Sequence, residues 1–114
     1  MKNLLVAIIV SLSFSIQAQS TLDGLWDTGE ANTKINVSEK NSLWSGVVKA
    51  SDIKDDIGEL ILKDLKKDGE KWTGKIYAPK YKEWYDVEII TQENNLKLKV
   101  SAGIGSKSLV WKKS

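Results

Sequence analysis

The chain contains no cysteine and no histidine among its 114 residues. Without thiols it can form neither a disulfide framework nor a thiolate nucleophile, and no cysteine is present to carry a lipid anchor. Without imidazole, a Ser-His-Asp triad, a histidine general base and the usual kind of zinc site are excluded. The fold therefore has no covalent cross-link, and catalysis, if there is any, falls to carboxylates.

Arginine is absent too, because all 17 basic side chains are lysines. Arginine usually supplies the bidentate contacts to phosphates and bases. The lysines are scattered among 15 acidic residues instead of forming a stripe, and the formal net charge is only +2. This composition argues against nucleic-acid binding.

Long apolar runs are absent except at the N-terminus. There, Lys2 precedes an uncharged and mostly apolar segment from Leu4 to Ile16, and small and polar residues follow at 18–20. This layout is typical of a secretory signal peptide, and the run is too short to span a bilayer, which takes about 20 residues. We predict a signal peptide over residues 1–18, cleavage after Ala18 or one or two residues later, and export to the periplasm or the medium without a transmembrane segment.

The remaining residues, 19–114, fit one small domain, because no linker or shift in composition divides them. Apolar and polar residues alternate with period two in short segments that turn-forming residues separate. We predict strands at Leu22–Asp27, Thr33–Ser38, Leu43–Ala50, Leu60–Leu62, Trp72–Ala78, Glu83–Ile89, Leu96–Ala102 and Lys107–Lys113. The run at Leu60 also fits a helix, because Ile57, Ile61 and Leu65 lie at helical spacing.

About eight short strands joined by short turns predict an all-β, antiparallel up-and-down meander that closes into a small barrel, in preference to a sandwich. Closure is favoured because it leaves no exposed sheet edge. An eight-stranded barrel is either filled by side chains or holds one small ligand. We expect indoles to provide most of the lining, from Trp26, Trp44, Trp72 and Trp111.

Trp44-Ser45-Gly46 and Trp72-Thr73-Gly74 share a pattern of indole, hydroxyl residue and glycine. Two copies are too few to indicate a repeat architecture. A glycine beside a large indole lets a neighbouring backbone or side chain approach closely. We therefore interpret both glycines as packing positions.

Four features occur in an order that resembles the lipocalin-like superfamily and, more closely, the DUF2147 family of small exported bacterial proteins of unknown function. They are Gly24-Leu25-Trp26, the apolar run Ile57–Leu65, the segment Trp72–Pro79 followed by Tyr85, and Trp111. The resemblance implies a lipocalin-like β-barrel and export, and it implies no activity. The chain departs from the family pattern at Ala78, at Lys82-Glu83 and around Gly103–Ser106.

The predicted hairpin around Pro79 gathers aromatic side chains at its tip. We predict that the protein is not an enzyme and that it binds a small apolar or amphipathic ligand, or a cell-envelope component, at the barrel end lined by Tyr77, Tyr81, Trp84 and Tyr85. Alternatively, these rings fold over the barrel mouth as a plug. A rival function is a protein-interaction module with a filled barrel.

Carboxylates offer two further alternatives. Asp86 and Glu88 lie two apart on one strand face and could act as the acid pair of a glycan hydrolase, although alternating charge is typical of a solvated strand face. The acidic loop with Asp52, Asp55, Asp56 and Glu59 could hold calcium, but its spacing is not that of a twelve-residue calcium loop. We favour the solvated interpretation of both and predict no metal or cofactor.

Overall fold

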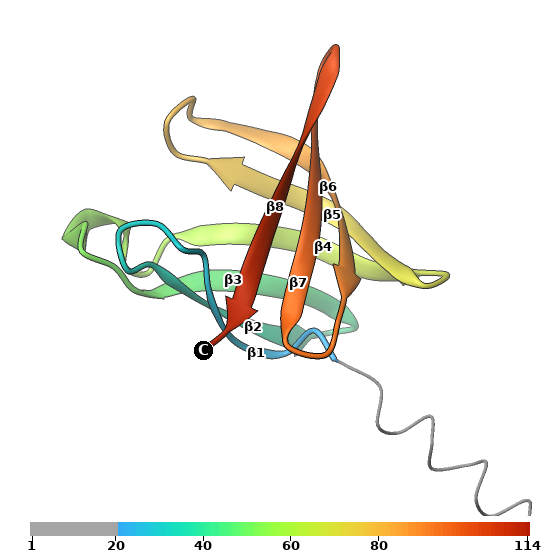
Figure 1. Ribbon diagram of the computed structural model, residues 1–114, viewed down its shortest axis with the longest axis horizontal. Coiled ribbons are helices and arrows are strands. Elements are labelled where there is room, and N and C mark those ends of the chain that lie inside the picture. Colours follow the sequence, from blue (N-terminus) through green and yellow to red (C-terminus); the bar gives the residue numbers. More distant parts are fainter. Residues whose placement is uncertain (1–20) are drawn as a thin grey trace, which may run out of the picture.

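A computed structural model describes residues 21–114, which form a closed, eight-stranded antiparallel barrel (Figure 1). Each strand pairs with the next in the chain, and the last pairs with the first. The strands are β1 (Gly24–Asp27), β2 (Lys34–Lys40), β3 (Leu43–Ala50), β4 (Leu60–Asp68), β5 (Lys71–Ala78), β6 (Glu83–Thr91), β7 (Asn95–Ala102) and β8 (Gly105–Lys113). The predicted all-β barrel is confirmed, whereas the predicted signal peptide, residues 1–18, lies outside the described residues.

The up-and-down order places alternate connections at opposite ends of the barrel. One end, called the loop end, holds the connections 28–33, 51–59, 79–82 and 103–104, and it lies to the left and top in Figure 1. The other, called the turn end, holds the connections 41–42, 69–70 and 92–94. A single 3₁₀ turn, η1 (Lys54–Asp56), lies in the loop that joins β3 to β4.

The apolar run at Leu60 belongs to strand β4 and not to a helix. The pairing of β4 with β5 shifts between Lys63 and Lys66, and Asp64 has a positive φ of 55°. This bulge lets Leu62 and Leu65 both face the core, where each is fully buried. In a regular strand two residues three apart would face opposite sides.

Aliphatic side chains fill the barrel. The buried hydrophobic set comprises Leu22, Trp26, Ile35, Val37, Val48, Ile61, Leu62, Leu65, Ile76, Val87, Ile89, Leu96, Leu98 and Trp111, and none is more than 8% exposed. An open chamber would leave its lining accessible, so the interior is packed. The expectation that indoles provide most of the lining is wrong, because only Trp26 and Trp111 belong to this set.

Two other indoles lie near the turn end. Trp44 and Trp72 pack against the core, and their ring centroids lie 5.4 Å apart in an edge-to-face arrangement with an interplanar angle of 72°. This is the geometry that aromatic pairs prefer. On β1, the indole Nε1 of Trp26 donates a 3.0 Å hydrogen bond to the carbonyl oxygen of Leu22, which lies before β1 and is fully buried. These contacts extend the packed core toward the turn end and to the segment before β1.

The two glycines of the repeated pattern are packing positions, as predicted. A Cβ placed on Gly46 would lie 2.9 Å from Cγ2 of Ile35, and one on Gly74 would lie 2.7 Å from Cδ2 of Leu65. The same Gly74 Cβ would also lie 2.8 Å from the carbonyl oxygen of Lys63, which backbone geometry holds in place. Both glycines thus let core leucine and isoleucine side chains reach the sheet.

The barrel closes through a short pairing of β1 with β8, which we call the seam. β1 pairs with β8 only through Trp26 opposite Lys113 and Asp27 opposite Lys112. β8, however, continues along β7 as far as Gly105, so the β7–β8 hairpin projects beyond the seam at the top of Figure 1. The expectation that closure leaves no exposed edge is therefore wrong for the first part of β8.

Candidate functional site

The loop end carries most of the large hydrophobic side chains that are exposed. Of eight such residues in the described part of the chain, five lie there: Ile53, Ile57, Leu60, Tyr81 and Ile104. Ile104, at the tip of the β7–β8 hairpin, is fully exposed, and Tyr81, at the tip of the β5–β6 hairpin, is 62% exposed. We call these five residues the apolar rim.

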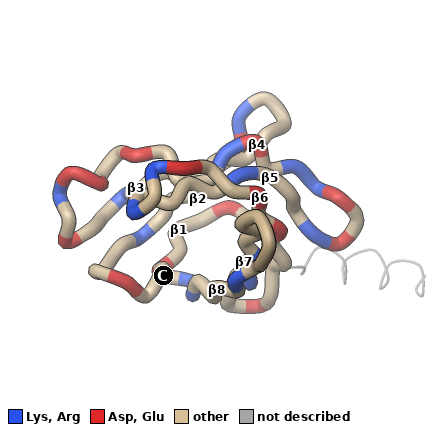
Figure 2. The backbone as a smooth tube through the Cα atoms, turned by 90° about the horizontal axis from the view of Figure 1, so that it is seen from above, with Lys and Arg blue, Asp and Glu red and all other residues tan. Residues whose placement is uncertain are grey.

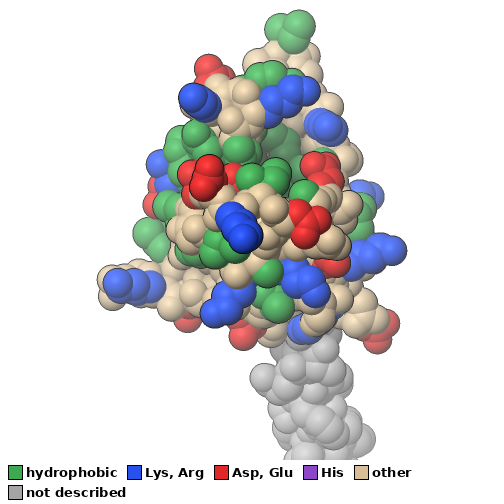
Figure 3. Space-filling view, turned by 90° about the vertical axis from the view of Figure 1, so that its left-hand side faces the viewer, with side chains coloured by type: hydrophobic (Ala, Val, Ile, Leu, Met, Phe, Trp, Pro, Cys, Tyr) green, Lys and Arg blue, Asp and Glu red, His purple; other side chains and the backbone are tan. Residues whose placement is uncertain are grey.

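The loop end also has a shallow hollow (Figure 3). Figure 3, which looks at the left-hand side of Figure 1, shows hydrophobic side chains gathered around a depression beneath the hairpin that projects at the top. Behind it, Tyr85, Val100 and Leu109 lie on the inner faces of β6, β7 and β8 and are only partly buried against the core. An apolar surface thus continues from the rim to the core.

The 51–59 loop is tied to the β1–β2 connection. The Nδ2 group of Asn32 donates a 2.9 Å hydrogen bond to the Asp52 carboxylate, and the backbone N–H of Asp52 donates to the carbonyl oxygen of Ala31 at 2.9 Å. The hydroxyls of Thr33 and Ser51 lie 3.0 Å apart and form a third bond. These bonds hold the 51–59 loop, and with it Ile53 and Ile57, against the β1–β2 connection.

The four predicted site residues divide between three places. Tyr81 belongs to the apolar rim, and Tyr85 faces inward opposite Ile76. Tyr77 and Trp84 pair across β5 and β6 on the outer wall, with ring centroids 5.1 Å apart and planes tilted by 51°, and Tyr77 is also partly buried against the core cluster. The Lys63 ammonium lies 4.1 Å from the centroid of the Trp84 ring, a cation–π contact.

Tyr85 is held as a neutral phenol at physiological pH. Partial burial and a hydrogen bond to the Glu83 carboxylate raise the pKa of Tyr85 above its ordinary value of 10.0. Lys80 and Lys82 flank Tyr81, and the Lys80 ammonium lies 5.7 Å from the Tyr81 ring centroid. The aromatic part of the loop end therefore combines apolar rings with a neutral hydroxyl and two ammonium groups.

Charge on the barrel is mixed. Figure 2 shows acidic and basic positions alternating along the strands and around the loops, with no face of one sign. The 51–59 loop is acidic, but Asp52 is engaged by Asn32. Within residues 21–114, no three acidic side chains gather closely enough to hold a metal ion.

The carboxylates considered for glycan hydrolysis are ion-paired on the outer wall. Asp86 pairs with Lys75, and Glu88 pairs with Lys71 at 3.1 Å. Both line an open groove of about 490 Å³ on the outside of the barrel. Each carboxylate is thus matched to a cation from the neighbouring strand, which is how a solvated strand face stabilises alternating charge.

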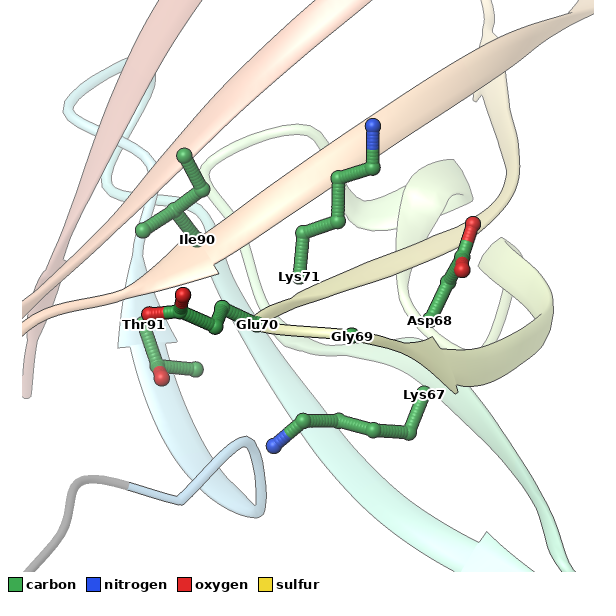
Figure 4. Close-up of a pocket in the computed structure, with 7 residues that line it drawn as sticks. All are labelled: Lys67, Asp68, Gly69, Glu70, Lys71, Ile90 and Thr91. Atoms are coloured by element: carbon green, nitrogen blue, oxygen red, sulfur yellow. The ribbon is translucent and has the colours of Figure 1, made fainter.

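A second groove, of about 680 Å³, lies beside the β4–β5 turn at the turn end (Figure 4). Its lining mixes Lys67, Asp68, Gly69, Glu70, Lys71, Ile90 and Thr91. Figure 4 shows Lys67 and Lys71 pointing in different directions, and the two acidic side chains also diverge. No set of polar groups converges on one point, so this groove is a less suitable site than the loop end.

Sequence reasoning did not assign the rim residues other than Tyr81 to the site. Ile53 and Ile57 lie within an otherwise polar loop, and Ile104 lies between two glycines in a turn. Turn positions usually carry polar residues, so a large apolar side chain at such a position was a usable signal.

A protein-family model matches residues 24–113, and its description is an uncharacterized protein conserved in bacteria (DUF2147). The matched range includes all eight strands. No curated protein and no solved structure matches the chain. Residues 21–114 also contain no helix that is long and apolar enough to cross a membrane.

Proposed function

The chain belongs to the DUF2147 family, and from that premise we propose that it is an exported, non-enzymatic β-barrel that binds an amphipathic cell-envelope component at its loop end. The apolar part of that component contacts the rim, and its polar part lies beside Lys80 and Lys82. Tyr85 forms the inner wall of the site, and Tyr81 contributes an exposed ring at the tip of the β5–β6 hairpin.

The clustering of exposed apolar residues at one end is the observation that carries this proposal. Five of the eight exposed large hydrophobic side chains within residues 21–114 are on the loop end, while Trp44 and Trp72 pack together near the opposite end. Scattered single apolar residues are normal on protein surfaces, but a concentration of them at one end of the barrel supports a binding surface there. The packed interior supports a ligand held at the mouth and not inside the barrel.

Binding at the mouth is expected to be modest and shared among the loops. Covering a half-exposed isoleucine or tyrosine contributes roughly 1 kcal/mol, which corresponds to about a fivefold change in dissociation constant. A single polar substitution in the rim should therefore weaken binding about fivefold without abolishing it. Two substitutions in different loops should weaken binding by about the product of their separate effects.

The test uses Ile104→Ser in the rim and Ile90→Ser as a matched control, because Ile90 is exposed near the turn end. Tryptophan fluorescence would be titrated with a single-chain phospholipid below its critical micelle concentration. We expect Ile104→Ser to weaken binding about fivefold and Ile90→Ser to leave it unchanged. Equal effects of the two substitutions, or no response of the natural protein, would reject the proposal.

A protein-interaction module is the second candidate, and the packed interior also supports it. Its surface would be the outer-wall pair Tyr77 and Trp84 with the Lys63 contact. Trp84→Ala separates the two candidates, because this indole faces away from the hollow. Loss of lipid binding in Trp84→Ala would indicate that the binding surface lies on the outer wall and not at the loop end.

The absence of catalysis and the export of the chain are parts of the same proposal. The ion pairs of Asp86 and Glu88 support the first, and the double variant Asp86→Asn, Glu88→Gln tests it on envelope glycans. Turnover by the natural protein that disappears in the double variant would show that the protein is a hydrolase.

N-terminal sequencing of protein recovered from the cell envelope tests export, with Gln19 as the expected first residue.

A further inference from the structure

The projecting part of β8 has β7 on one side and no strand on the other. β1 reaches only Lys112 and Lys113. From Gly105 to Val110, no segment of residues 21–114 is paired with the second side of β8. An unpaired strand edge presents a row of N–H and C=O groups that can join another strand.

The register of the β7–β8 hairpin identifies which groups face outward. Ala102 and Gly105 flank its two-residue turn and form a hydrogen-bonded pair, and bonding then alternates along the strands. The backbone groups of Ser106, Ser108 and Val110 consequently point away from β7. These three residues supply the donors and acceptors of the free edge.

Natural proteins usually protect such edges with lysine, proline or a bulge. Here the edge residues are two serines and a valine, and the β7–β8 pairing has no shift in register. Lys107 is the only charged residue between Gly105 and Val110, and its backbone groups face β7. The edge is therefore regular, uncharged at its bonding positions and accessible.

We propose that this edge pairs with the same edge of a second copy, so that two barrels form a two-fold dimer through an antiparallel β8–β8 contact. With the axis at Ser108, Ser106 of one copy lies opposite Val110 of the other. Lys107 then faces Leu109 of the second copy, so no lysine faces a lysine. The contact forms about six inter-strand hydrogen bonds, two from each bonded pair.

The alignment with the axis at Ser108 is the one in which the outward-facing backbone groups of Ser106, Ser108 and Val110 all form bonds in each copy. Moving the axis to Lys107 would place two lysines opposite each other, which is unfavourable across a strand pair. Moving it to Val110 would bring Ser108 opposite Lys112, whose edge β1 already occupies. A two-fold contact closes on itself, so the assembly stops at two copies. The inference does not depend on ligand binding at the rim.

The test is sedimentation equilibrium of the protein purified after export, across roughly three decades of concentration, because a short strand contact is smaller than a standard interface. Ser108→Pro removes an edge N–H that the barrel itself does not use. Ser108→Lys places two ammonium groups on the two-fold axis. Ser108→Ala keeps the N–H and is the matched control.

We expect the natural protein and Ser108→Ala to reach twice the monomer mass at the same concentration. Ser108→Lys should weaken association at least tenfold, and Ser108→Pro should remain a monomer with an unchanged circular dichroism spectrum. If Ser108→Pro does not fold, Ser108→Lys still decides. A natural protein that stays monomeric throughout, or a Ser108→Lys variant that dimerises equally well, would overturn the proposal.

Discussion

At the scale of single residues, Gly74 is the position where the absence of a side chain matters most. A Cβ there would meet both the Leu65 side chain and the carbonyl oxygen of Lys63. The backbone oxygen cannot move without disturbing the bulge in β4. Gly74→Ala should therefore lower the free energy of unfolding by about 1–3 kcal/mol, as overpacking does in other cores. Urea denaturation measures the change.

Gly105→Ala is the control for that prediction, because nothing lies within 4 Å of a Cβ placed on Gly105. Its effect should stay within about 0.5 kcal/mol. If both alanine variants were equally stable, the close packing of Leu65 against Gly74 would not be present in solution.

Tyr85 makes stability depend on pH in the alkaline range. Its pKa is raised in the folded barrel, so the folded state resists ionisation more than the unfolded state does. The stability associated with the neutral phenol is complete below pH 10 and is lost as pH rises through the folded pKa. Tyr85→Phe should lose less stability between pH 9 and pH 11 than the natural protein, as measured by urea denaturation. A Tyr85→Phe variant with the same alkaline loss would show that other groups cause it.

The packing role of a residue could be predicted where few physical explanations account for that residue type at that position. Gly46 and Gly74 were recognised because a glycine beside an indole in a strand has few explanations except close approach. The burial of Trp26 and Trp111 was also predicted. The edge-to-face contact of Trp44 with Trp72 was not, because it depends on how two hairpins meet across β4.

At the scale of elements, the bulge at Asp64 determines which residues of β4 enter the core. Asp64 has a positive φ, which aspartate tolerates and a β-branched residue does not. Asp64→Val should lower the free energy of unfolding by about 1–2 kcal/mol, whereas Asp64→Gly should not destabilise by more than about 0.5 kcal/mol. Thermal unfolding of both variants measures this. Equal destabilisation by valine and glycine would mean that the Asp64 side chain, and not its backbone conformation, is important.

Strand positions were largely predictable because one face of most strands is buried and the other is solvated. The run at Leu60 was ambiguous for a physical reason: a bulge makes buried residues recur three apart, which imitates a helix. The start of β8 was predicted two residues late. Gly103 adopts φ of 66° and makes a two-residue turn, so the strand resumes already at Gly105.

At the scale of the whole molecule, the closed barrel followed from the number of strands, but its lining and its seam did not. The expected share of indoles in the core was too large, because Trp44 and Trp72 lie at one end and Trp84 lies on the outer wall. The free edge of β8 arises because β1 has only four residues against nine in β8. The short length of β1, and not the alternation of apolar and polar residues, leaves this edge of β8 unpaired.

The candidate site was predicted in part. The sequence placed an aromatic cluster on the β5–β6 hairpin at a barrel end, and the hairpin lies at the loop end. Alternation alone separates inward Tyr85 from outward Trp84, but it does not show that isoleucines from two other loops lie at the same end. Barrel topology provides that information, because alternate connections meet in space.

The central claim is that the loop end, and not the interior or the outer wall, is the binding surface. Amide chemical shifts of isotopically labelled protein during titration with a single-chain phospholipid test it most directly. The account predicts shifts concentrated in residues 51–59, 79–82 and 103–104, with the β4–β5 turn at residues 69–70 unaffected. Shifts concentrated instead around the Tyr77 and Trp84 pair, or spread through the buried strands, would contradict it.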